Sequence, residues 1–161
     1  MELINVDESL IELTSDFAQS VFIDYYTPLN GSEHANYMAD MFLSQKAIKE
    51  LLGEGAVFKL VMDDNKPVAY TEYKKDGDRV FLSKLYAHKD YRGRKLGDLM
   101  LNDCIEYTKS SGLNKIYLTV NKYNTPSYNI YLHKGFKVID SVETDIGHGY
   151  IMDDYIMELT I

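Results

Sequence analysis

The chain has 161 residues, 45% of them hydrophobic and 26% charged, and its 17 Lys and Arg against 25 Asp and Glu give a formal net charge of −8. This composition is typical of a globular protein, and it excludes an intrinsically disordered chain. The acidic balance argues against a nucleic-acid partner, and the single cysteine, Cys104, excludes an internal disulfide and a multi-cysteine zinc site.

No membrane or export signal is visible in the sequence. No apolar run approaches the ~20 residues that a membrane helix needs. The acidic N-terminal segment lacks the basic start of a signal peptide. We therefore expect a cytoplasmic protein without a membrane partner. Because there is no repeat, low-complexity tract or linker-like stretch, we expect a single domain over residues 1–161.

The N-terminal segment predicts a short strand followed by a helix. Apolar and polar residues alternate over residues 3–6, as in a strand. Ser9, with Glu12 three residues later, forms a capping-box pattern for a helix that starts at residue 10. We expect Pro28 and the pair Asn30-Gly31 to break this helix, because proline removes a helical hydrogen bond and Asn-Gly is typical of a turn.

A second helical region is predicted over residues 34–52, with a break near Ser44, and a meander of three strands follows. After the meander, helical and strand patterns alternate. The predicted strands cover 57–62, 68–73, 79–87, 116–120, 136–142 and 150–159, and the later helices cover 96–109 and 127–134. The order predicts an α+β fold: a mixed, mostly antiparallel sheet of about seven strands, flanked by about four helices.

A basic, glycine-containing turn lies between the strand 79–87 and the helix 96–109. Backbone N–H groups at a helix start lack partners, and the helix dipole favours an anion there. Arg92, Arg94 and Lys95 add positive charge to this turn of an acidic chain. The turn therefore suits a diphosphate, and the alternative is a solvated turn with surface cations. The glycine patterns of dinucleotide-binding folds and P-loops are both absent.

This turn resembles the first signature of the GNAT superfamily of N-acetyltransferases, [Q/R]-x-x-G-x-[G/A]. Arg92 and Gly97 match its ends, whereas Lys95 stands where the middle glycine is usual. The second signature, N-x-x-[A/S]-x-x-x-Y-x-x-x-G-F, is matched at every fixed position. These positions are Asn124, Ser127, Tyr131, Gly135 and Phe136.

The resemblance covers nearly the whole chain and implies an enzyme that uses acetyl-CoA and no metal. It implies that the backbone of Leu85, Tyr86 and Ala87 binds the pantetheine arm and polarises the thioester carbonyl. It implies that the turn binds the pyrophosphate and that Asn124 contacts the cofactor arm. The residues of the turn are Arg92, Gly93, Arg94, Lys95, Leu96 and Gly97.

The resemblance also places Tyr131 near the thioester sulfur, where its hydroxyl could protonate the leaving thiolate. The alternative is a packing aromatic. Many relatives carry a glutamate near the position of Ser83, and this chain has none there. Glu72 is our candidate base, with a water chain through Ser83 as an alternative. Glu72 could instead be a solvent-facing strand residue.

The acceptor pocket is expected between the early helices and the closing strands. We expect Tyr26, Glu33, His34 and Asp145 to bind the acceptor, with the acidic pair 153–154 nearby. Carboxylates near a pocket attract a cationic amine. The segment 144–155 also resembles that of bacterial spermidine/spermine acetyltransferases.

We therefore expect acetyl transfer to a polyamine or another small cationic amine, by direct attack in a ternary complex. Three alternatives remain open at this point: a protein or peptide N-acetyltransferase, a non-catalytic acyl-CoA-binding module and an interaction subunit of a larger complex. The choice between a monomer and a homodimer is also open.

Overall fold

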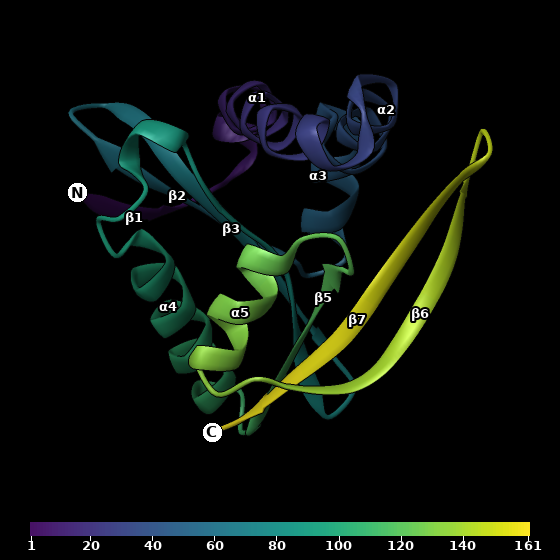
Figure 1. Cartoon of the computed structure of the whole chain (residues 1–161). Coiled ribbons are helices and arrows are strands. Elements are labelled where there is room, and N and C mark those ends of the chain that lie inside the picture. The colour runs from purple at the N-terminus through teal and green to yellow at the C-terminus, as the bar shows by residue number, and fades with distance from the viewer.

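The computed structural model describes all 161 residues, and their strands form one seven-stranded sheet in the order β1-β2-β3-β4-β5-β7-β6 (Figure 1). Only β4 and β5 are parallel neighbours. The strands are β1 (Glu2–Asn5), β2 (Val57–Asp63), β3 (Lys66–Asp76), β4 (Arg79–Ala87), β5 (Lys115–Asn121), β6 (Lys137–Gly147) and β7 (Tyr150–Thr160). The helices are α1 (Ile11–Asn30), α2 (Ser32–Leu43), α3 (Gln45–Gly53), α4 (Leu96–Ser110) and α5 (Thr125–His133). The predicted mixed α+β fold is confirmed.

The structure has five α-helices where the sequence predicted about four, because the region 34–52 forms two. Ser44 separates them: its backbone is extended, and its Oγ accepts a hydrogen bond from the Ala47 N–H at 3.1 Å. This side-chain cap starts α3 in a new direction. None of the helices is both long and apolar enough to cross a bilayer.

The pair Asn30-Gly31 ends α1 as predicted: the helix runs to Asn30, and the Gly31 N–H donates to the Thr27 carbonyl. Pro28, the other predicted break, does not interrupt the helix. A proline in the last turn removes one intrahelical bond while the later ones can still close. Ser9 does not cap α1 either. It lies in a 3₁₀ turn, η1 (Glu8–Leu10), and Asp7 Oδ1 accepts from the Ser9 N–H at 3.0 Å.

Helices cover both faces of the sheet. The packing of α1, α2 and α3 buries one face, against side chains such as Phe58, Leu60 and Tyr70. The other face is covered by α4 and by α5 in front of it (Figure 1), where Cys104 is buried among core residues such as Leu82 and Leu118. The sheet therefore separates two apolar layers, and a site that uses both layers has to pass through the sheet.

The sheet opens between β4 and β5. Only Val80 pairs with Ile116 and Phe81 with Tyr117; beyond these pairs the two strands diverge. At the start of the gap β4 has a bulge, because Tyr73 pairs with Leu82 and Glu72 with Lys84, which leaves Ser83 unpaired. The gap gives the sheet a passage from one face to the other, with one edge of β4 free of a partner strand.

Candidate active site

The larger of two cavities lies in the gap between β4 and β5, beside α4 and α5, and has a volume of about 540 Å³. This volume lies within the range typical of small-molecule sites, about 300–1,000 Å³. The backbone of β4 from Leu82 onward faces this gap without a partner strand. Ten of the eleven residues that the sequence predicted to bind the cofactor line this cavity. They are Leu85, Tyr86, Ala87, Arg92, Gly93, Lys95, Leu96, Gly97, Asn124 and Tyr131.

One end of the larger cavity is the basic turn before α4. Lys95, at the usual glycine position of the signature, adopts a left-handed conformation with φ 61° and ψ 26°, which glycine takes most readily. The loop therefore keeps its shape at a steric cost. No side chain caps α4, so the first N–H groups of the helix are free to bind an anion.

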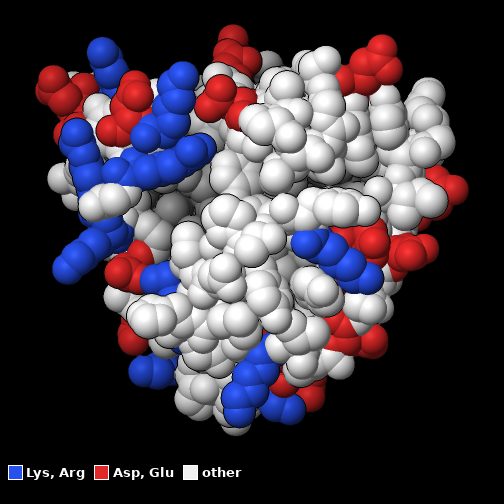
Figure 2. Space-filling model, viewed as in Figure 1, with Lys and Arg blue, Asp and Glu red and all other residues white.

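Positive charge gathers at this turn. Figure 2 shows Lys and Arg side chains together over the segment that joins β4 to α4 in Figure 1. Arg92 and Lys95 line the cavity. Arg94, also expected to bind the cofactor, does not line it; its guanidinium lies over the ring of Tyr91, 4.7 Å from the centroid. Lys134, at the C-cap of α5, also lines the cavity and is paired with Asp98 of α4.

The start of α5 is held against the end of α1. Asn124 is buried at the N-cap of α5, where its Oδ1 accepts from the Ser127 N–H at 3.3 Å. Its Nδ2 donates to the hydroxyl of Tyr25 at 2.7 Å. The sequence could not show this contact, because Tyr25 and Asn124 are 99 positions apart. It fixes one wall of the larger cavity.

Tyr131 lines the same cavity from α5 and packs edge-on against Phe136, with ring centroids 5.5 Å apart. Burial raises the pKa of the Tyr131 phenol well above its ordinary value, so the hydroxyl is protonated at neutral pH. The hydroxyl makes no hydrogen bond to another protein group. It is therefore a free proton donor facing the cavity.

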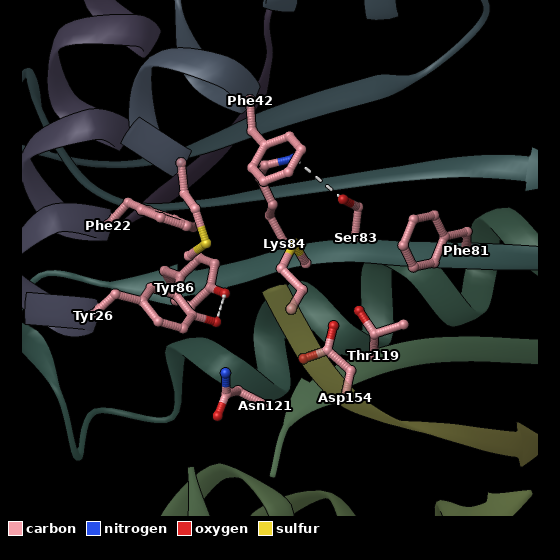
Figure 3. Close-up of a pocket in the computed structure, with 12 residues that line it drawn as sticks. Phe22, Tyr26, Phe42, Phe81, Ser83, Lys84, Tyr86, Thr119, Asn121 and Asp154 are labelled. Atoms are coloured by element: carbon pink, nitrogen blue, oxygen red, sulfur yellow. Dashed lines mark hydrogen bonds between the residues drawn. The ribbon is translucent and has the colours of Figure 1, made fainter. Parts of the chain in front are cut away.

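The smaller cavity, of about 180 Å³, lies on the opposite face of the sheet, between α1, α2 and strands β4, β5 and β7 (Figure 3). Its walls are mostly aromatic rings and methionines, with a few polar groups from the strands. The lining residues are Phe22, Tyr26, Met38, Phe42, Phe81, Ser83, Lys84, Tyr86, Thr119, Asn121, Met152 and Asp154.

The two cavities meet at four residues that line both: Tyr26, Ser83, Tyr86 and Thr119. The hydroxyls of Tyr26 and Tyr86 are hydrogen-bonded to each other at 2.8 Å (Figure 3). Burial raises the pKa of both phenols, so neither is a base near neutral pH. A group held in the larger cavity and a group held in the smaller one can therefore meet at this junction, within the opening of the sheet.

Glu72, the candidate base, lines neither cavity. It is buried on the α1–α3 face, where its Oε1 accepts from Lys84 Nζ at 3.3 Å. Lys84 also donates to Ser83 Oγ at 3.1 Å. The alternative of a solvent-facing residue is wrong, because the side chain is buried. Glu72 neutralises the buried ammonium of Lys84 beside the bulge.

Of the residues expected to bind the acceptor, only Tyr26 lines either of these two cavities. Glu33 is exposed on α2, and Asp145 is exposed on β6, where its Oδ1 accepts from the Gly147 N–H at 2.8 Å. His34 stacks on Tyr150 with ring centroids 4.4 Å apart and joins α2 to the β6–β7 hairpin. Glu33 and His34 lie in the first turn of α2, and Asp145 lies near the end of β6, so all three side chains are outside both cavities.

Asp154 is the acidic residue that lines the smaller cavity. It pairs with Asn121 in the β5–β7 register and is buried in the smaller cavity. Burial, and next the charge of Asp153, raise the pKa of its carboxyl to about 6, against the opposing effect of Lys122. Asp153 has a partner in Lys122, at 2.8 Å, and the Asp154 carboxylate has neither a hydrogen bond nor an ion pair.

A model of the acetyltransferase (GNAT) family matches residues 16–136. The chain belongs to this family. It is therefore an acetyltransferase, with acetyl-CoA as its co-substrate, as the two signatures predicted. The fold prediction and the enzyme class are both confirmed.

Individual relatives are distant in sequence. A spermidine N(1)-acetyltransferase of Thermoplasma acidophilum is 22% identical over 143 residues, which are 86% of each chain. The crystal structure of a PaiA N-acetyltransferase from the same organism, in complex with coenzyme A, is 21% identical and matches with a TM-score of 0.84 over 99% of this chain and 98% of that one. A GCN5-related N-acetyltransferase from Rhodopseudomonas palustris matches with a TM-score of 0.82 at 14% identity, over 99% and 95%.

Proposed function

We propose that this acetyltransferase moves the acetyl group of acetyl-CoA to the primary amine of a polyamine or another small cationic amine, by direct attack in a ternary complex. The observation that carries the proposal is the pair of cavities on opposite faces of the sheet. They meet at Tyr26, Ser83, Tyr86 and Thr119. Such an arrangement brings two substrates together without a covalent enzyme intermediate, and Cys104 is buried in the core, away from both cavities.

The residues of the larger cavity fit acetyl-CoA. The free N–H groups at the start of α4, with Arg92 and Lys95, suit the diphosphate. The unpaired edge of β4 from Leu82 to Ala87 offers backbone donors and acceptors to the amide groups of the pantetheine arm, as an added strand would meet them. N–H groups of the same edge can stabilise the negative charge that develops on the thioester oxygen.

Tyr131 is the proposed acid. Its protonated hydroxyl faces the larger cavity and can give a proton to the sulfur as the carbon–sulfur bond breaks. A positioned acid of this kind contributes a factor of about 10²–10⁴ to the rate.

The smaller cavity supports a slender aliphatic amine as the acceptor. At about 180 Å³ it is below the range of drug-sized sites, so it admits the amino end of a chain rather than a whole bulky substrate. Its apolar walls suit methylene groups, and Asp154 suits an ammonium. The net charge of −8 attracts a polycation from solution. The spermidine acetyltransferase of T. acidophilum points to the same substrate class.

The proposal is tested by measuring CoA release from acetyl-CoA with spermidine, spermine, putrescine and a set of lysine-containing peptides. We expect saturable release with the polyamines. Release with peptides alone would replace the polyamine by a protein amine as acceptor. Binding of acetyl-CoA without release in the presence of any amine would contradict the proposed activity.

The Tyr131→Phe variant tests the acid. We expect kcat to fall by about 10²-fold or more, because the leaving thiolate loses its proton donor, with little change in acetyl-CoA affinity by calorimetry. Tyr128→Phe, a change on the same helix outside both cavities, is the matched control. An unchanged kcat for Tyr131→Phe would remove this residue from the chemical step.

A further inference from the structure

The smaller cavity contains one charged group without a partner. Lys84, the cavity's other charged residue, is engaged by Glu72 and Ser83. Asp154 is 5% exposed and has no hydrogen bond or ion pair. A buried carboxylate without a partner is costly, and proteins retain one where a ligand or a reaction uses it. The group that complements it in a narrow apolar cavity is a cation.

We infer that Asp154 binds the ammonium of the acceptor and takes one of its protons, which makes it the catalytic base of the transfer. This inference rests on the proposed function and assigns the proton acceptor that the function requires. Figure 3 shows Asp154 on β7 beside Thr119 and Asn121 of β5, on the same side as the Tyr26–Tyr86 pair. Thr119 and the two tyrosines line the junction with the larger cavity.

Elimination leads to the same residue. The phenols at the junction are protonated near neutral pH, and Lys84 is a cation held by Glu72. In the larger cavity, the carboxylate of Asp98 lies on α4 and is paired with Lys134. Asp154 is therefore the carboxylate on this path that is free to accept a proton.

The proton step balances. The Asp154 carboxylate takes a proton from R–NH₃⁺, and the lone pair of the resulting R–NH₂ forms the new carbon–nitrogen bond. The carbon–sulfur bond breaks, and Tyr131 protonates the sulfur. The second proton lost by the nitrogen restores the Tyr131 hydroxyl. Asp154 then releases its proton to solvent, so each turnover yields one acetamide, one thiol and one proton.

Several neighbours set the protonation of Asp154. Asp153 of the same strand favours the neutral acid, and Lys122, directly after β5, favours the carboxylate. From α2 only the apolar Met38 and Phe42 line the cavity, and β6 places Val142 opposite Asp154. The titratable side chains that line the cavity from α1 and β4 are Tyr26, Lys84 and Tyr86. With its pKa raised to about 6, Asp154 is ionised at neutral pH yet basic enough to take a proton.

The test compares Asp154→Asn with Asp153→Asn, a neighbouring carboxylate that lies outside the cavity. For the wild type we expect kcat/KM for spermidine to rise with pH through a limb near pH 6. Asp154→Asn should lose this limb and lower kcat at pH 7 by about 10²-fold or more. Asp153→Asn should keep a limb, moved below pH 6, because Asp154 is intact but loses the neighbouring charge that raises its pKa.

Two readouts do not depend on turnover. A ¹³C NMR titration of the free protein should show a carboxyl of pKa near 6 that is absent from Asp154→Asn and that shifts when spermidine is added. Calorimetry should show equal affinity of both variants for CoA, which verifies that the variants are folded.

If Asp154→Asn kept both the pH limb of kcat/KM and the kcat of the wild type, the inference would be overturned and the proposed function would stand. A raised KM for the amine with an unchanged kcat profile would also overturn it, by reducing Asp154 to a binding residue. Failure of the wild type to release CoA with any amine would overturn the proposed function itself and this inference with it.

Discussion

Glu72 and Asp154 are two carboxylates on the same face of the sheet, and they are 3% and 5% exposed. Burial does not distinguish them, but their partners do. Glu72 meets the ammonium of Lys84 at 3.3 Å, and Asp154 has no partner within the protein. The first charge is neutralised by the fold, and the second is left for a ligand. A buried carboxylate is therefore a candidate site residue when no cation or hydrogen-bond donor of the protein is paired with it.

Breaking the Glu72–Lys84 pair should have the largest effect on stability. Glu72→Gln leaves the buried Lys84 ammonium with only the hydroxyl of Ser83, so we expect a loss of about 3–5 kcal/mol in the free energy of unfolding. Urea denaturation measures it. Glu54→Gln breaks an exposed pair with Lys74 and should cost less than about 1 kcal/mol. If both variants lost the same free energy of unfolding, Glu72 would contribute no more to stability than a surface carboxylate.

Neutralising Asp154 should raise the free energy of unfolding, whereas neutralising Glu72 should lower it. Its folded-state pKa, about 6, lies above the ordinary value of 3.8, so its ionisation opposes folding. This cost is fully present above about pH 6 and disappears as the pH falls toward 4. Asp154→Asn should therefore raise the free energy of unfolding at pH 7.5 by up to about 3 kcal/mol.

The same variant should gain little at pH 4, where the wild-type carboxyl is already protonated in the folded protein. Urea denaturation at both pH values checks this, with Asp153→Asn as the control for the loss of one acidic residue. A destabilised Asp154→Asn at pH 7.5 would mean that the carboxylate has a partner within the fold, as Glu72 has.

The smallest expected effect on stability comes from the backbone conformation of Lys95, in the turn proposed to bind acetyl-CoA. Lys95 is held in the left-handed region, which costs a non-glycine residue about 1–2 kcal/mol. Lys95→Gly should raise the free energy of unfolding by about 1 kcal/mol and weaken CoA binding, because a cation beside the diphosphate is lost. Lys95→Met is the control: it loses the cation and keeps the strain. Thermal unfolding and calorimetry separate the two effects, and equal stability of both variants would contradict the strain.

Much of the fold was predictable because its signals are local. The alternation of strands 57–87, the helix at 96–109 and the break at Ser44 all follow from residues within a few positions of one another. Pro28 does not interrupt α1, because it lies near the C-terminal end of the helix and removes one hydrogen bond, while the pair Asn30-Gly31 ends the helix as predicted. Ser9 was misread because Asp7, two positions earlier, forms the cap instead.

The larger cavity was predictable for the same reason: most of its lining comes from two contiguous stretches, 82–101 and 124–134, which contain the first signature and most of the second. The smaller cavity was not, because it joins α1, α2, β4, β5 and β7. Asp153 and Asp154 are adjacent in sequence, and only the β5–β7 register decides which one faces the cavity. The contact between Glu72 and Lys84 likewise depends on the bulge at Ser83, which shifts the pairing of β3 and β4 by one residue.

The position of the two cavities on opposite faces of the sheet has a kinetic consequence. On the proposed function, acetyl-CoA and the amine approach from different sides, and the two cavities share only the four residues at the junction. Neither product has to leave before the other. In steady-state inhibition, CoA should therefore compete with acetyl-CoA but not with the amine, and the acetylated amine should compete with the amine alone.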